Sequence, residues 1–113
     1  MQARTVRKLA LSLPEAEERE TWGTATFRVR NKIFVMFGEG GKEAWVKCTH
    51  DEQRALIAMD PETFSFPPYV GSSGWVGIRF AGVDAVEMHE LITEAWRMTA
   101  PKRLVKTFDG ETA

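Results

Sequence analysis

The sequence is poor in cysteine, in charge of one sign and in long apolar runs. Cys48 is the single cysteine among 113 residues, so no internal disulfide can form. No apolar run approaches the roughly 20 residues that span a bilayer, and the N-terminal stretch lacks the continuous apolar segment of a secretory signal. We therefore expect a cytoplasmic protein that has no membrane partner. Fifteen Lys and Arg against 16 Asp and Glu give a net charge of -1, which argues against a long-range attraction for nucleic acid.

The apolar content is sufficient for one folded domain. Hydrophobic residues make up 43% of the chain and include seven Phe, four Trp and one Tyr. This share is too high for a disordered chain, and the length suits one modest core. We expect a single domain over residues 1–113, with a frayed tail from about Thr107.

Helix signals appear at four places, one of which is a short helix through Leu56, Ile57 and Met59 that Asp60-Pro61 interrupts. A short amphipathic helix ends before Pro14, because proline disfavours helical geometry in the residue that precedes it. The strongest helix carries a capping box and an apolar stripe that includes Trp96, which we expect in the core. Pro101 can open a further short helix. The expected caps are, in chain order, Thr5, then Thr49 or Asp51, then Asp84.

Alternating apolar and polar residues predict strands over residues 25–30, 33–37, 43–48 and 75–80. Residues 63–69 contain Pro67-Pro68 and suit an edge or an extended connection. The acidic segment over residues 15–20 is expected to be a solvated connection. The sequence therefore predicts an α+β fold with two layers, in which helices pack on one face of an antiparallel sheet of about four to five strands.

A two-residue turn at Asn31-Lys32 would fix the register of the first hairpin. With that turn, one face of the hairpin carries only apolar residues and should meet the helices. This core face would hold Phe27, Val29, Phe34 and Met36, and the opposite face would hold Arg28, Arg30, Ile33, Val35 and Phe37.

The same parity argument places cations and aromatic rings together on the uncovered face of the sheet. Bases stack on exposed aromatic rings while Arg and Lys meet phosphates, so this combination is typical of single-strand binding. The alternative is that Trp45 and Trp75 are packing residues covered by the loop over residues 67–73. The candidate site comprises Arg28, Arg30, Trp45, Lys47, Tyr69, Trp75 and Arg79.

Catalytic and metal-binding patterns are weak. Cys48 lies near His50, but no acid that would orient the histidine is identifiable, so a buried structural cysteine is the expected outcome. His50 and His89 lack metal-ligand spacing and are expected at the surface or at a helix cap. Trp22 is expected to anchor the start of the first strand. We therefore expect no catalytic residue, no metal, no cofactor and no enzyme activity.

The chain resembles the MmcQ/YjbR-like family of small bacterial proteins from about Val6 to Leu104. The resemblance rests on the order and spacing of several short patterns. These are Leu13-Pro14, Glu18, Trp22-Gly23, Thr26-Phe27-Arg28-Val29, Lys32 with Phe34, Trp45 with Lys47, Pro68-Tyr69, Gly74-Trp75-Val76 and the helix with Trp96. The resemblance implies a frataxin-like (CyaY-like) fold and the DNA-binding label that members commonly carry.

Two functions follow as hypotheses. The first is a nucleic-acid-binding module, for which a single strand suits the aromatic and basic face better than a duplex. The second is an interaction domain that uses the same face for a protein or an acidic small ligand. Neither the ligand nor the oligomeric state can be predicted from the residues.

Overall fold

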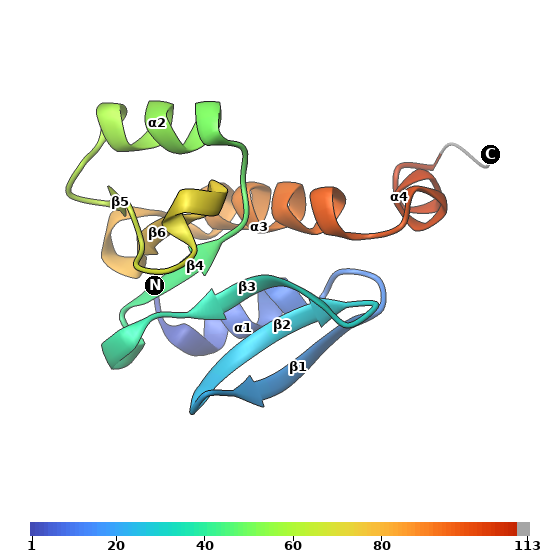
Figure 1. Cartoon of the computed structure of the whole chain (residues 1–113). Helices are drawn as coiled ribbons and strands as arrows, with labels where there is room; N and C mark the ends of the chain where they lie inside the picture. Colours follow the sequence, from blue (N-terminus) through green and yellow to red (C-terminus); the bar gives the residue numbers. More distant parts are fainter. Residues whose placement is uncertain (111–113) are drawn as a thin grey trace.

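The structure is a computed structural model that describes residues 1–110. It has an α+β architecture in which one six-stranded antiparallel sheet has the order β1-β2-β3-β4-β6-β5 (Figure 1). The predicted fold class is confirmed, although the sheet has six strands where four to five were expected. The elements are α1 (Ala3–Leu11), β1 (Ala16–Thr21), β2 (Thr24–Val29), β3 (Lys32–Phe37), η1 (Glu39–Gly41), β4 (Glu43–Val46), α2 (His50–Met59), β5 (Phe64–Ser65), η2 (Gly71–Ser73), β6 (Val76–Arg79), η3 (Phe80–Gly82), α3 (Ala85–Thr99) and α4 (Lys102–Phe108).

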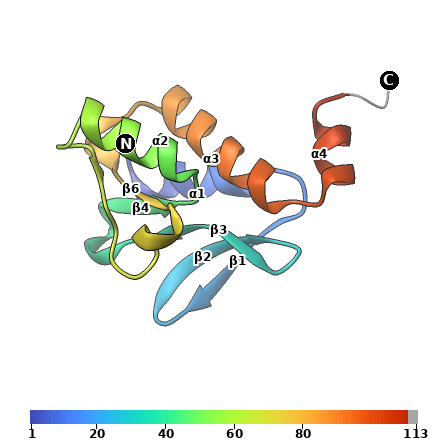
Figure 2. The ribbon, with the colours of Figure 1, turned by 45° about the horizontal axis from the view of Figure 1, so that its top comes forward.

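The helices α1 and α3 cover one face of the sheet and enclose the core (Figures 1 and 2). α2 lies beside β5 at the far edge of the sheet, and α4 extends beyond the end of α3. The sheet supplies buried aliphatic and aromatic side chains that α1 and α3 meet from the other side. The largest fully buried side chains are Trp96, Phe27, Phe34, Phe64, Ile78, Met88 and Ile92.

Two of the expected helix caps are present. The Asp84 carboxylate accepts a hydrogen bond from the backbone N–H of Glu87 at 2.8 Å, and α3 begins directly after it. The Thr49 hydroxyl accepts from the backbone N–H of Glu52 at 3.1 Å and starts α2. Trp96 is fully buried, as predicted. By contrast, α1 begins after Gln2, without a side-chain cap, and not after Thr5.

The acidic segment is an edge strand, which corrects the prediction of a solvated connection. β1 pairs with β2 residue by residue, from Ala16 opposite Val29 to Thr21 opposite Thr24. An edge strand needs backbone pairing on only one side and can leave its side chains in water, so it shows no apolar alternation. Charged residues on such an edge also discourage further strand addition.

The turn between β2 and β3 lies one residue earlier than the predicted turn at Asn31-Lys32. Arg30 and Asn31 occupy the turn with φ of 51° and 66°, because a two-residue hairpin turn matches the strand twist when both φ values are positive. Val29 therefore pairs with Lys32, and the register shifts again between Phe27 and Arg28.

The second of these shifts places Val35, Met36 and Phe37 on the faces opposite to those expected, whereas Phe34 is fully buried in the core, as predicted. Val35 lies opposite Phe27 and is fully buried on the helix side of the sheet. The ring of Phe37 packs against those of Phe27 and Phe80, at centroid distances of 5.4 and 6.0 Å. Met36 lies opposite Thr26 and Trp45, on the side away from α1 and α3.

The C-terminal segment remains helical beyond the point where fraying was expected. Thr107 and Phe108 belong to α4, and the Phe108 ring lies 4.9 Å from the Trp96 ring. Residues 111–113 of the expected tail lie outside the described residues. None of the helices in residues 1–110 is long and apolar enough to cross a membrane.

Candidate functional site

The face of the sheet opposite α1 and α3, called the open face from here on, carries polar, aromatic and basic side chains. A continuous row of directly paired residues crosses it, formed by Arg19, Thr26, Met36, Trp45, Gly77 and Ser65. Arg28 lies two residues from Thr26 along β2, and Arg79 lies two residues from Gly77 along β6. Strand alternation therefore brings Arg28, Trp45 and Arg79 onto one face.

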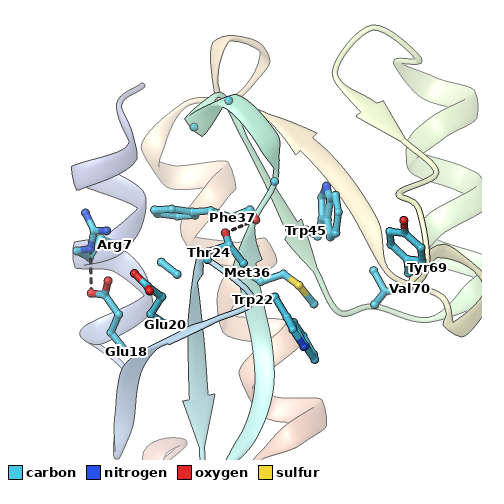
Figure 3. A pocket seen from close by; sticks show the side chains of 15 residues that line it. Arg7, Glu18, Glu20, Trp22, Thr24, Met36, Phe37, Trp45, Tyr69 and Val70 are labelled. Carbon is cyan, nitrogen blue, oxygen red and sulfur yellow. Dashed lines mark hydrogen bonds and ion pairs between the residues drawn. The ribbon is translucent and has the colours of Figure 1, made fainter.

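A groove of about 860 Å³ lies at the end of the sheet where the β1–β2 turn meets the β3–β4 loop. Its open-face part is lined by aromatic and apolar side chains, and Figure 3 shows their arrangement around one space. Backbone at Gly23, Gly38, Gly40 and Gly41 joins this part to the helix side of the sheet. The side chains that line the groove on the open face are Trp22, Met36, Trp45, Tyr69 and Val70, and those on the helix side include Arg7, Glu18, Glu20 and Phe37.

Trp22 and Tyr69 are the most exposed aromatic residues of the site. Trp22 is 84% exposed at the tip of the β1–β2 hairpin, and Tyr69 is 92% exposed in the segment before η2. Both residues have positive φ, at 54° and 66°. Bulky side chains rarely adopt this left-handed conformation, which costs about 1 to 2 kcal/mol relative to ordinary backbone. The expectation that Trp22 anchors the start of a strand is wrong, because Trp22 and Gly23 form the turn itself.

Trp45 and Met36 form a fixed floor between these two rings. The Trp45 indole N–H donates to the Glu43 carboxylate at 3.2 Å, and Met36 is only 6% exposed. A Cβ atom at Gly38 would approach Trp45 Nε1 to 2.8 Å, and one at Gly77 would approach Cδ1 to 3.6 Å. A side chain at Gly38 would therefore collide with the indole, so the ring occupies space that this glycine leaves free, whereas a Cβ atom at Gly77 would make only an ordinary contact.

Trp75 does not join this surface. It is only 8% exposed, and its carbonyl accepts a hydrogen bond from the Gln53 side chain of α2 at 2.6 Å. The packing alternative therefore holds for Trp75, whereas Trp45 stays partly exposed. The sequence could not separate the two rings, because both occupy the same parity on neighbouring strands.

Arg30 lies apart from the other cations. It sits in the β2–β3 turn, where its Nε donates to the Glu15 carboxylate at 2.5 Å. This hydrogen bond, assisted by the charge of the guanidinium, lowers the pKa of the Glu15 carboxyl below its usual value. Arg30 is therefore engaged in a surface ion pair at the edge of the molecule.

The open-face cations Arg28, Lys47 and Arg79 have no ion-pair partner within the described residues. The Arg28 guanidinium donates to the Thr21 hydroxyl at 2.9 Å and to the Asn31 carbonyl at 3.3 Å. Lys47 follows β4, and its backbone N–H donates to the Phe34 carbonyl at 3.2 Å. Glu17 lies directly opposite Arg28 on β1, and Glu43 lies directly opposite Arg79 on β4, so carboxylates stand beside two of these three cations.

Cys48 and His50 show the geometry of structural residues. The Cys48 thiol is buried and donates to the Gly74 carbonyl at 3.1 Å. Burial raises its pKa to about 11, with a smaller contribution from the charge of Glu52. His50 Nε2 lies 3.0 Å from the Ser72 carbonyl oxygen at the start of α2. Within residues 1–110, no group of three or more His, Cys, Asp or Glu side chains is placed to hold a metal ion.

The sequence places the chain in a known family. The family model described as YjbR matches residues 11–98, which is most of the chain. The chain belongs to the YjbR family. The YjbR match includes both sides of the groove, from the β1–β2 hairpin with Trp22 to the segment with Tyr69.

The names of the sequence relatives of this YjbR chain state no activity. Proteins of Mycobacterium bovis and of two strains of Mycobacterium tuberculosis, all named uncharacterized, are each 43% identical over 54 residues. The match covers 48% of this chain and 42% of each relative, so the chain spans under half the length of these proteins.

A solved structure of similar fold is the Deinococcus radiodurans protein DR2400, described with the family domain DUF419. Its TM-score is 0.77 at 17% identity, and the match covers 87% of this chain and 78% of that chain. At this identity, the similarity is one of fold alone.

Proposed function

We propose that this YjbR-family protein is a binding module that holds single-stranded nucleic acid on its open face. The observation that carries the proposal is the pair of exposed rings, Trp22 and Tyr69, on two sides of one groove. Each ring is kept in a left-handed backbone conformation that glycine would adopt more easily. Strain of this kind tends to persist at binding sites, where the exposed side chain has a use.

The groove has the chemistry needed to hold a base. An aromatic ring stacks on a nucleobase with about 1 to 3 kcal/mol per base and with little dependence on sequence. Trp22 and Tyr69 supply exposed ring faces, and Trp45 with Met36 supplies an apolar floor. Arg28, Lys47 and Arg79 lie on the same face and form no ion pair within the described residues, so their charges can attract phosphates.

A single strand suits this site better than a duplex. Bases in a duplex are stacked on one another and are not free to insert between two side chains. A duplex reader also needs a helix or ribbon that enters the major groove. The exposed residues of α3 include Glu90 and Glu94, which would repel phosphates, and the whole chain has a net charge of -1.

We propose binding without catalysis, in the cytoplasm. Cys48, the one candidate nucleophile that the sequence suggested, is buried with its pKa raised to about 11, so little of it is thiolate at neutral pH. The cytoplasmic location is supported by the single cysteine, which needs no oxidising compartment.

A small planar ligand with an acidic group is the second candidate. It is favoured by the groove volume of about 860 Å³, which lies within the range of about 300 to 1,000 Å³ common for small-molecule sites. A ligand of this kind would use the groove alone, whereas a nucleic-acid strand would also contact Arg28 and Lys47.

The test is titration of short single-stranded DNA and RNA oligonucleotides at low ionic strength, followed by fluorescence anisotropy. We expect Trp22→Ala and Tyr69→Ala each to weaken binding by about 5- to 150-fold, the loss of one stacked base. Phe66→Ala is the matched control, because Phe66 is also an exposed aromatic residue but does not line the groove.

The outcomes separate the candidates. Weakening by both groove variants, with Phe66→Ala near wild type, supports the proposal. If neither DNA nor RNA forms a salt-dependent complex, the proposal fails. Binding of free nucleotides as tight as that of oligonucleotides, with no effect of salt, would favour the small-ligand candidate instead.

A further inference from the structure

Two guanidinium groups meet at one uncharged oxygen atom on the open face. Arg19 Nη1 donates to the side-chain oxygen Oδ1 of Asn31 at 2.7 Å, and Arg28 Nη1 donates to the same atom at 3.5 Å. Arg19 and Arg28 come from the paired strands β1 and β2, and Asn31 comes from the turn between β2 and β3. An amide oxygen has no charge, so this contact brings two positive charges together without neutralising either of them.

The Arg28 guanidinium is held in one orientation by acceptors that are all uncharged. Its Nε donates to the Thr26 hydroxyl at 3.4 Å, its Nη1 to the Asn31 carbonyl at 3.3 Å, and its Nη2 to the Thr21 hydroxyl at 2.9 Å. These hydrogen bonds fix the group but leave its charge in place. Thr21 directly precedes Trp22, so the fixed charge lies close to the exposed ring at the groove.

Arg19 supplies the free donors of the pair. A guanidinium has five N–H groups, and only Nη1 of Arg19 makes a hydrogen bond within the described residues. The neighbouring carboxylate is that of Glu17, whose Oε2 lies 3.8 Å from Arg19 Nη2, beyond hydrogen-bond distance. The Arg19 and Glu17 side chains are 52% and 66% exposed, and exposed ion pairs of this kind are weak. Two guanidinium groups against one carboxylate leave the cluster positive.

We propose that Arg19 and Arg28 form a phosphate-binding site beside Trp22. Guanidinium groups bind phosphate oxygens through charge-assisted hydrogen bonds, and two adjacent groups can contact two oxygens of one phosphate. The proposal rests on the proposed function and adds where one phosphate of the bound strand lies, next to the base that stacks on Trp22. Glu17 opposes this binding, because its carboxylate repels the phosphate and competes for Arg19.

The experiment uses three short oligonucleotides of one sequence, which carry a 5′-phosphate, a 3′-phosphate or neither. We expect Arg19→Gln and Arg28→Gln each to reduce the slope of log affinity against log salt by about 0.7, because each removes one contact to phosphate. The reduction is confined to a strand with a terminal phosphate if that group occupies the site, and is equal for all three strands if an internal phosphate does. Glu17→Gln should act in the opposite direction and tighten binding by up to about fivefold.

Arg54→Gln is the matched control, because Arg54 is also an exposed arginine in a surface ion pair, with Asp51, but lies on α2 at the far edge of the sheet (Figure 1). We expect its salt slope to stay near that of wild type. If Arg54→Gln lowers the slope as much as Arg28→Gln, or if Glu17→Gln weakens binding, the phosphate site is wrong although binding stands. If no strand binds the wild-type protein, the proposed function itself fails.

Discussion

At the scale of single residues, Trp22 was assigned to the wrong role because its backbone conformation is not encoded by its side chain. Its exposure and positive φ arise from the β1–β2 turn, which forms only when the acidic segment pairs as a strand. Trp96 could be predicted, since an apolar stripe at helical spacing requires its burial. Tyr69 was included in the site from its position near Pro68, and the structure places it at the groove.

The left-handed conformation of Trp22 leads to a stability prediction that is separate from binding. Alanine keeps a Cβ atom and thus the cost of positive φ, whereas glycine relieves it at the expense of greater freedom in the unfolded chain. We expect Trp22→Gly to have a free energy of unfolding about 1 kcal/mol higher than Trp22→Ala, measured by urea denaturation. Both variants lack the ring and should bind oligonucleotides equally weakly. Equal stability of the two would show that the backbone there is not strained.

At the scale of elements, signals inside one segment were predictable and those that depend on a partner strand were not. The Asp84 cap and the strands of the second half follow from local patterns. β1 was missed because Glu17 to Glu20 carry no apolar alternation, and pairing with β2 alone makes the segment a strand. The register shift between Phe27 and Arg28 then moved Met36 to the open face, where it forms part of the groove floor.

The cap of α3 provides a test at this scale. The Asp84 carboxylate satisfies the Glu87 N–H, which would otherwise lack a helical partner. We expect Asp84→Ala to lower the free energy of unfolding by about 1 kcal/mol and Asp84→Asn to retain most of it, because asparagine caps as well as aspartate. Thermal or urea denaturation measures both. A loss of the same size in the asparagine variant would mean that charge, and not the hydrogen bond, stabilises this end of the helix.

At the scale of the whole molecule, a nearly neutral total charge conceals an ordered distribution. The open face carries Arg28, Lys47 and Arg79 without ion pairs within the described residues, with Glu17 opposite Arg28 and Glu43 opposite Arg79. The sequence showed a net charge of +3 for residues 21–50, from five cations and two carboxylates. It could not show that Arg30 pairs with Glu15, which comes from outside that segment. The effective basic surface is therefore smaller than the count suggests.

Stability at alkaline pH depends on Cys48, which links β4 to the segment before β6 through the Gly74 carbonyl. Its pKa rises from an ordinary value of 9.0 to about 11 in the folded protein, because burial disfavours the thiolate. Between these values the unfolded chain loses the proton first, so the free energy of unfolding falls as pH rises from 9 to 11. We expect Cys48→Ala to have a lower stability at pH 7 but a shallower decline over that interval, measured by urea denaturation at each pH. Parallel declines in the two proteins would mean that the thiol titrates alike in the folded and unfolded chains.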